Sequence, residues 1–387
     1  MAYETIQTYQ GYDRHQYERA FRHTMAMHFP EIEQNVFRAF ALTALIQARG
    51  QVVMGVGGNG FDWRVQWRLP RVGGYTGFGP RTFNQSDLYK MAKQEWRGYE
   101  ATAFIPEGEV KRNHGSPKME DVLQRMPQEL QEAMEQHLGV QIYIDGDDAT
   151  TSSQLTSWHG LKSLFKTDGN TINNDGSGSR SANAADYVAT PAVAGSYAGI
   201  YSKLGYYAGA QETDIPWPEG VADPEYDFWS GLIVQKDSSS FGSTKIKDAI
   251  RFGLTHSMRN RIPGGGQPDY VFIDRSDFID FKEYVDGKEQ VWATPADSEL
   301  VNLGFKNTIR FDGAEVTMEH SMPVGEGFGI NFGDIALLCC TDKMFDENAP
   351  VYDEDQAGFK SWTNTLSNLR IKRGPRAGFA LKKNALI

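Results

Sequence analysis

Polar and apolar residues alternate between Phe61 and Pro70. Phe, Trp, Val and Trp take the odd positions, and Asp, Arg, Gln and Arg take the even ones. A period of two with aromatic side chains predicts a β-strand that ends at the proline. Residues 71–85 hold four glycines and a proline, which predicts a loop. A second aromatic stretch follows over residues 88–110, so the sequence predicts a long hairpin with little core of its own.

The apolar spacing changes after Ser116 and Pro117, which suit the cap and the first turn of a helix. Residues three and four apart then share one apolar face. They are Met119, Val122, Leu123, Met126, Leu130, Ala133, Met134 and Leu138. The pattern predicts one long helix over residues 117–139 that bends at Pro127 and ends at Gly139.

The remaining segments mix helices and strands. Residues 1–60 show some helical spacing but little sign of a core, which indicates an arm that packs on something else. The stretch 170–186 is rich in Gly, Ser and Asn, which is typical of an exposed loop. Further expected elements are a helix over 244–261, a strand over 268–274, a helix capped by Ser276, and strands at 307–311, 314–320, 327–332, 334–340, 368–374 and 377–384. This order predicts an α+β fold.

Composition excludes several classes of protein. The chain has 387 residues, 40% of them hydrophobic, and a net charge of −11. That balance favours a globular core and argues against a protein that reads DNA by neutralising phosphates. Cys339 and Cys340 are the only cysteines, so we expect buried strand residues in a reducing compartment. We find no signal-peptide core and no apolar run long enough for a membrane helix, and expect a soluble product made in the cytoplasm.

Motifs that would carry chemistry are weak. Gly55, Gly57 and Gly60 match G-x-G-x-x-G, but a strand pattern follows where a nucleotide site needs a helix. The eight histidines are scattered, and no H-E-x-x-H occurs. The cluster of Asp145, Asp147 and Asp148 is too small for a calcium loop and indicates a solvated turn. We therefore predict no catalytic, cofactor-binding or metal-binding residues.

The order of these segments resembles the major capsid protein of tailed bacteriophages with the Hong Kong 97 fold. The resemblance runs from about residue 60 to the end, and its specificity lies in order and spacing, since each motif alone is degenerate. The segments on which the resemblance rests are FDWRVQWRLP (61–70), LYKMAKQEWRGYEATAF (88–104), the helix from Pro117 into IDGDD, WHGLKSLF (158–165), YAGIYSKLGYYAG (197–209), FWSG (228–231), PDYVFIDRSDFIDFKEY (268–284) and the closing strands 303–340.

The resemblance implies a division of the chain by role. Residues 1–60 would be the N-terminal arm and 61–108 the extended hairpin loop. Residues 109–145 and 306–387 would form the peripheral domain, with 117–139 as its spine helix. Residues 146–305 would form the axial domain, in which about 168–193 is an inserted loop. Tyr201-Ser202-Lys203 stands where the family commonly has Asp-Arg-Ser.

The family resemblance also implies a function without catalysis. The chain would assemble with itself into hexamers and pentamers of an icosahedral virion shell around double-stranded DNA, made in the host cytoplasm. A scaffolding protein, a portal and decoration proteins are possible partners, and no membrane is involved. Candidate inter-subunit contacts are Trp63, Arg64, Trp67, Arg68, Arg71, Tyr75, Phe78, Arg81, Trp96 and Tyr99. An encapsulin-like compartment and a soluble hydrolase are the alternatives.

For the aromatic and charged candidates we predict two kinds of contact. Trp63, Trp67, Trp96 and Tyr99 would bury aromatic area at the base of the hairpin or between subunits. The arginines would meet acidic groups on neighbouring copies. A simple core role for the tryptophans is the competing interpretation, and both can hold at once.

Overall fold

The computed structural model describes residues 40–66, 89–112, 122–146, 157–165, 196–201, 229, 232–236, 245–257, 267–286, 299–303, 307–372 and 378–382. The expectations for most of the arm, the hairpin tip, the helix cap at Ser116 and the inserted loop lie outside these residues. The described chain divides into two compact units. We term residues 98–138 and 343–366 the ribbon unit, and residues 39–97, 139–342 and 367–387 the sheet unit.

The sheet unit is built on a six-stranded mixed sheet. Its order is β7 (Leu232–Gln235), β16 (Phe379–Lys382), β11 (Glu326–Ile330), β8 (Tyr270–Ile273), β10 (Ala314–Met318) and β9 (Thr308–Phe311). Strands β7 and β16 are parallel, as are β8 and β10, while β11 runs antiparallel to both of its neighbours. All four residues of β8 are buried, as expected for a strand covered on both faces.

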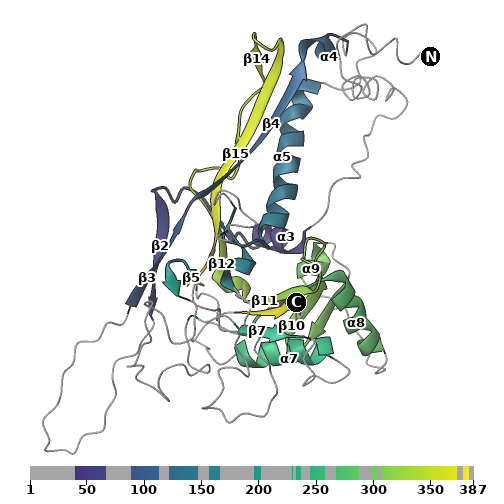
Figure 1. Ribbon diagram of the computed structural model, residues 1–387. Helices are drawn as coiled ribbons and strands as arrows, with labels where there is room; N and C mark the ends of the chain where they lie inside the picture. The colour runs from purple at the N-terminus through teal and green to yellow at the C-terminus, as the bar shows by residue number, and fades with distance from the viewer. Residues whose placement is uncertain are drawn as a thin grey trace, which may run out of the picture. The chain divides into compact units, whose positions relative to one another are not determined.

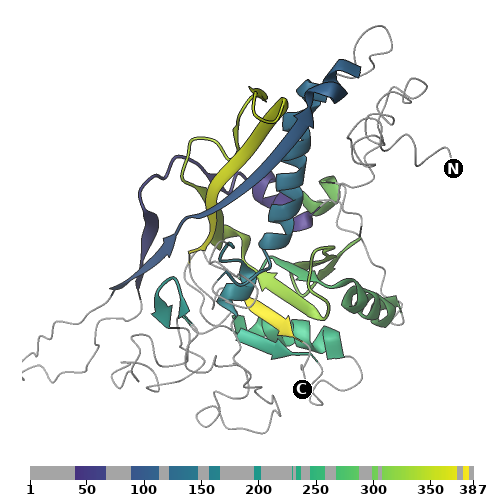
Figure 2. The same ribbon diagram turned by 45° about the horizontal axis from the view of Figure 1, so that its top comes forward.

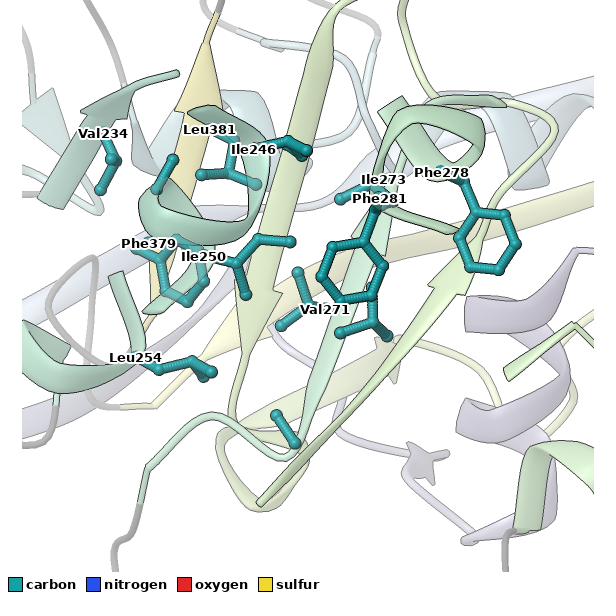
Figure 3. Close-up of a cluster of buried hydrophobic side chains, with 13 residues drawn as sticks. Val234, Ile246, Ile250, Leu254, Val271, Ile273, Phe278, Phe281, Phe379 and Leu381 are labelled. Carbon is teal, nitrogen blue, oxygen red and sulfur yellow. The ribbon is translucent and has the colours of Figure 1, made fainter. Parts of the chain in front are cut away.

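Two helices, α7 (Lys245–Ser257) and α8 (Arg275–Asp286), cover one face of this sheet (Figure 1). Apolar side chains of α7, α8 and the strands form one cluster, in which Ile250, Phe281 and Phe379 are fully buried (Figure 3). The ring of Phe379 fits between Gly253 of α7 and Gly329 of β11, where an added Cβ would collide with it. The two glycines therefore let helix and strand approach the same aromatic ring.

The opposite face of the sheet is covered by segments from elsewhere in the chain. Phe328 of β11 stacks against Tyr143 at 6.1 Å and contacts Phe165 at 5.8 Å, centroid to centroid. The guanidinium of Arg49 lies 5.2 Å from the ring centres of both Tyr270 and Phe332. These aromatic contacts complete the burial of the sheet.

Helix α3 (Ala41–Ala48) is held within the sheet unit by a carboxylate that is distant in the sequence. The N–H of Leu42 donates to Glu319 Oε2 at 3.2 Å, and the N–H of His320 donates to Oε1 at 3.0 Å. Burial raises the pKa of Glu319 although backbone N–H groups bind its carboxylate. Shorter elements of this unit are α6 (Leu161–Leu164), α9 (Glu299–Asn302), β5 (Ser196–Tyr197), β6 (Ile200–Tyr201) and the 3-10 turn Phe332–Asp334.

A second sheet contains the long strand β15 (Gly358–Ile371). Its first nine residues belong to the ribbon unit and its last five to the sheet unit. In the sheet unit, β1 (Val52–Val53) runs parallel to β12 (Ile335–Cys339), which pairs antiparallel with the end of β15. Cys339 is fully buried, and burial raises the pKa of its thiol to about 11. The expectation that the cysteines lie in a strand holds for Cys339, while Cys340 follows the end of β12. Both are free thiols.

The ribbon unit pairs β15 with β4 (Arg97–Pro106), β13 (Asp346–Glu347) and β14 (Val351–Asp353). Helix α4 (Glu107–Arg112) follows β4, and α5 (Val122–Gln141) runs alongside β4 and β15 (Figures 1 and 2). Buried Ile105 of β4 packs against Met126 of α5, with Ala103 and Val110 beside them. This cluster is small compared with the core of the sheet unit.

The secondary structure agrees with the sequence pattern in most elements. The six strands expected from residue 307 onward are present, and the mixed architecture confirms the α+β class. In the described residues, helix α5 runs without interruption through Pro127, and it continues to Gln141 instead of ending at the predicted Gly139. The cap of α8 was predicted wrongly. Asp274 precedes the helix and accepts hydrogen bonds from its first backbone N–H groups, while Ser276 only donates to Asp274 at 2.6 Å.

None of the described helices is long and apolar enough to span a membrane.

Candidate functional site: the root of the β2–β3 hairpin

The hairpin predicted from the alternating pattern is formed by β2 (Gly60–Gln66) and β3 (Tyr89–Glu95). The strands pair antiparallel, from Gly60 opposite Glu95 to Gln66 opposite Tyr89. After Glu95 the chain leaves the hairpin and enters β4, which pairs with β15. A strand thus follows the G-x-G-x-x-G glycines, which is incompatible with a dinucleotide site of that type.

The inner face of the hairpin root is aromatic. Phe61 is buried and lies 5.9 Å from the ring of Trp63 and 5.1 Å from the ring of Trp96. These rings pack on Ala336 and Leu338 of β12. Because β2 and β3 have no helix of their own, the contact with β12 supplies the apolar surface that the root needs.

Both indole N–H groups of this cluster are hydrogen-bonded to backbone. Trp63 Nε1 donates to the carbonyl of Lys372 at 3.0 Å, and Trp96 Nε1 donates to the carbonyl of Gly58 at 2.9 Å. These bonds give each partly exposed indole N–H an acceptor and fix the ring orientations. The tryptophans therefore position the hairpin against its own chain.

A third segment joins the root from the β5–β6 turn. The N–H of Lys93 in β3 donates to the carbonyl of Ala198 at 2.9 Å. The ring of Tyr197 lies 6.4 Å from Trp63 and 5.9 Å from Trp229, and its hydroxyl accepts from the N–H of Ile371 at 3.0 Å. Desolvation lowers the pKa of the neighbouring Arg370.

Polar bonds at the end of β3 complete the root. The side-chain amide of Asn368 is fully buried and donates to the carbonyl of Glu95 at 2.8 Å. It also lies 2.7 Å from His159 Nδ1. Asn368 therefore links β15, the hairpin and the segment 157–165, which are remote from one another along the chain.

The outer face of the hairpin is exposed. Tyr89 and Met91 are 54% and 51% exposed, and they alternate with Lys90 and Ala92 on the inner face. Arg64 lies opposite Met91 and is exposed. An exposed apolar and cationic face of this kind is available to a partner.

The candidate contact residues fall into four groups. Trp63 and Trp96 lie together at the root, and Arg64 lies on the outer face. Tyr99 belongs to the ribbon unit, where its ring meets His137 edge-on at 5.2 Å. The remaining candidates lie outside the described residues: Trp67, Arg68, Arg71, Tyr75, Phe78 and Arg81.

The sequence interpretation missed several residues of the root. Phe61 carried a usable signal, because it begins the same alternation as Trp63. His159 and Tyr197 lie in the segments 158–165 and 197–209 that carry the resemblance, but nothing local marked their contacts at the root. Asn368 carried no signal, since it is 209 positions from His159. Among the described residues, no group of three or more His, Cys, Asp or Glu side chains is arranged to hold a metal ion. The site positions a hairpin by packing and hydrogen bonding.

Comparison with known proteins gives the class of fold. No protein-family model matches the chain, and no curated protein sequence matches it. The capsid asymmetric unit of cyanophage A-1(L) is similar with a TM-score of 0.57 and 13% identity, over 91% of this chain and 95% of that chain. The capsid of a native GTA particle is similar with a TM-score of 0.51 and 11% identity, over 92% and 94% of the two chains.

The chain therefore has the fold of phage capsid proteins, along almost its whole length. An encapsulin complex from Synechococcus elongatus also aligns, with a TM-score of 0.49 and 9% identity over 91% and 89% of the chains. That value is too low to decide between a capsid and a compartment.

Proposed function

We propose that this chain is the major capsid protein of a tailed phage, with a shell fold of the Hong Kong 97 type. Copies assemble into hexamers and pentamers of an icosahedral head that encloses double-stranded DNA. The likeness to the cyanophage capsid chain carries this proposal, because it leaves only a small part of either chain unmatched. The acidic net charge of −11 suits a wall that contains DNA without gripping its phosphates.

The proposed roles of the segments follow the same division as the sequence interpretation. Residues 1–60 act as an arm and 61–108 as the extended loop. Residues 109–145 and 306–387 act as the peripheral domain, and 146–305 as the axial domain. The root of the hairpin supports this assignment, since it is fixed to its own chain while its outer face carries exposed Arg64, Tyr89 and Met91.

The main partners in this proposal are other copies of the same chain. A scaffolding protein, a portal and decoration proteins are further partners, and the chain has no catalytic role. Assembly takes place in the host cytoplasm, and the product is part of the virion. Closed symmetric shells reuse the same contacts many times, so each contact can be weak alone.

Sedimentation and electron microscopy of the expressed protein, with the products of its neighbouring genes, test the proposal. We expect closed particles whose contents, when packaged, are DNA. Particles filled with an enzyme would indicate an encapsulin-like compartment instead. A chain that stays a small oligomer at high concentration and with scaffold present would contradict both shell functions.

Deletion of residues 71–82 tests the role of the hairpin tip. We expect the shortened chain to fold, with the aromatic cluster at Phe61 intact, and to assemble poorly. Circular dichroism and thermal melting check folding, and particle yield checks assembly. Normal particles from the deletion variant would show that the tip bears no contact between subunits.

A further inference from the structure

The side chain of Gln94 is buried at the hairpin root without a hydrogen bond. Gln94 is 3% exposed and lies on the inner face of β3, with fully buried Ala92 two residues before it. Among the described residues, neither its Oε1 nor its Nε2 has a hydrogen-bond partner. An amide that leaves water without gaining a partner raises the free energy of the folded state.

An apolar ring lies beside this amide. Phe61 of β2 is directly opposite Gln94, so the two side chains are neighbours on the same face of the hairpin. Phe61 is 5% exposed and packs on Ala336 and Leu338 of β12. The amide is therefore buried on the face by which the hairpin contacts the rest of the sheet unit, and it would regain water if the hairpin moved away.

A second unfavourable feature lies in the β5–β6 turn. Tyr197 pairs with Ile200, so Ala198 and Gly199 form a two-residue loop, and their φ angles are positive at 53° and 77°. Two-residue loops with positive φ at both positions favour glycine, asparagine and aspartate, because a Cβ is strained in the left-handed conformation. Ala198 adopts this conformation although it has a Cβ, so the turn stores backbone strain.

The strained residue is also one that binds the hairpin. The carbonyl of Ala198 accepts from the N–H of Lys93 at 2.9 Å, and Lys93 directly precedes Gln94. The strained turn and the buried amide therefore act on adjacent residues of β3. Backbone strain persists only where surrounding contacts hold it, and here the hairpin supplies one of those contacts.

The hairpin can move without breaking a larger sheet. In the sheets that the structure describes, β2 and β3 pair only with each other. The hairpin is held to the rest of the sheet unit by the aromatic cluster at Phe61 and by single hydrogen bonds, such as those of Trp63 and Asn368. Because an isolated two-stranded hairpin is marginally stable in water, its strands would separate once these contacts are lost.

We propose that the β2–β3 hairpin opens as a local unit while the rest of the sheet unit stays folded, and that Gln94 and Ala198 keep the free energy of this opening low. Opening hydrates the amide of Gln94 and lets the turn at Ala198 relax. Both effects arise from contacts within one chain. The consequence for a shell rests on the proposed function: the hairpin could take a new position on a neighbouring copy without unfolding of the sheet.

Hydrogen–deuterium exchange of the full-length, unassembled chain tests the opening. We expect the amides of β2 and β3 to be protected at least about a hundredfold less than those of β8 and β10, after correction for intrinsic exchange. Their exchange should also depend less on added denaturant, because a local opening exposes little surface. Equal protection and equal denaturant dependence in the two pairs of strands would overturn the proposal.

The variant Gln94→Met tests the buried amide. Methionine is similar in length and lacks the polar groups, so the protection of β2 and β3 should rise about tenfold. The matched control is Gln66→Met, which makes the same change on the exposed face of the hairpin and should alter protection by less than about twofold. Unchanged or lower protection in Gln94→Met, or an equal gain in the control, would overturn the proposal.

The variant Ala198→Gly tests the strained turn independently. Glycine adopts a positive φ without strain, so the protection of β2 and β3 should rise by roughly threefold or more. The control Ala357→Gly relieves the same kind of strain, at a φ of 46° in the ribbon unit, and should leave the hairpin unchanged. No gain in Ala198→Gly, or an equal gain in the control, would contradict the proposal. Because these measurements need no particles, their failure leaves the shell function standing, and absence of particles leaves the opening testable.

Discussion

Strand β8 of the sheet unit buries apolar side chains, whereas strand β15 in the ribbon unit buries polar ones. All of β8 is buried, with Val271, Phe272 and Ile273 fully so. On β15 the buried positions of the ribbon are Ser361, Thr363 and Thr365, while Leu366 is 38% exposed. The first strand follows the usual separation of apolar inside from polar outside, and the second inverts it.

The inversion extends over the ribbon unit. Phe104 of β4 is 36% exposed, and Val351 and Tyr352 of β14 are 48% and 43% exposed. The ring of Phe104 lies against Gly358, whose missing side chain leaves room for it. A single chain gains little by exposing these groups, so they fit a surface that neighbouring copies cover, as the proposed shell requires.

Among the substitutions that compare the packing of the two units, Phe379→Ala should have the largest effect on stability. The ring fills the space between Gly253 and Gly329, and its loss leaves a cavity in the main core. We expect the free energy of unfolding to fall by about 3–5 kcal/mol, measured by chemical denaturation of the unassembled chain.

The matched change in the ribbon unit is Phe359→Ala. Phe359 is half-buried and meets Tyr352 edge-on at 5.3 Å, so its removal should cost less than about 2 kcal/mol. Equal losses from the two substitutions would show that the units are equally well packed, which would remove the contrast.

A smaller effect with the opposite sign is expected from Thr363→Val. Thr363 is fully buried, and among the described residues its hydroxyl has no hydrogen-bond partner. Valine has nearly the same shape without the hydroxyl, so the ribbon unit should gain about 1 kcal/mol. Thermal melting and denaturation of the unassembled chain measure the change.

Ser361→Ala is the control for that substitution, because Ser361 donates to the carbonyl of Asn348 at 2.7 Å. Removing this donor should lower stability by about 1 kcal/mol. If Thr363→Val also destabilised the chain, the hydroxyl of Thr363 would have a partner in solution.

The two units also differ in how far the sequence could predict them. The alternation at Phe61 and Trp63 gave the hairpin, and the spacing from Met126 to Leu138 gave helix α5, because local periodicity carries both. Strands β9 to β12 and β16 of the sheet unit followed for the same reason, whereas β13, β14 and the first ten residues of β15, all but one of them in the ribbon unit, were not predicted. Local patterns of this kind are set by residues close together in the chain.

Contacts across long sequence separations were beyond such patterns. The cap of α3 by Glu319 joins residues 277 positions apart, and Asn368 binds the carbonyl of Glu95 across 273 positions. The predicted cap of α8 was wrong for a different reason. Serine and aspartate are both good N-cap residues, and only the observed start of the helix decides between Ser276 and Asp274. The inter-subunit contacts expected of all ten candidate residues remain predictions, and six of these residues lie between positions 67 and 88, outside the described residues.

A third and smaller effect on stability is expected from Leu366→Ser. This side chain lies on the exposed face of the ribbon unit over Gly98, so the unfolding free energy should change by no more than about 0.5 kcal/mol. Assembly should suffer much more, because the substitution removes apolar surface that a neighbour would cover. Particle yield by sedimentation is the measurement.

Asn364→Ser is the matched control, since Asn364 is exposed on the same face of β15 and is already polar. It should leave both stability and particle yield unchanged. If Leu366→Ser and Asn364→Ser assembled equally well, the exposed apolar groups of the ribbon would have no role between copies.

The smallest expected change in stability concerns a charged pair. One such pair is exposed in the ribbon unit and another is buried in the sheet unit, and the pKa values of their aspartates shift in opposite directions. Lys360 donates to Asp353 at 3.0 Å, and this bond lowers the pKa of Asp353. In the sheet unit Asp277 also has a lysine partner, Lys236, yet burial raises the pKa of Asp277. Proximity of a cation thus dominates on the surface, and desolvation dominates inside.

Lys360→Gln should therefore show a pH dependence of definite sign. A carboxyl whose pKa is lowered by folding stabilises the chain above the unfolded pKa, near 3.9, and loses that contribution as the pH falls through the folded value. The variant should be slightly less stable than the unchanged chain at pH 7, and the difference should vanish in acid. Denaturation midpoints across the pH range measure it. In an Asp353→Asn background the same lysine substitution should have no pH-dependent effect, and a difference that persisted there would assign the role of Lys360 to packing of its alkyl chain instead of to its charge.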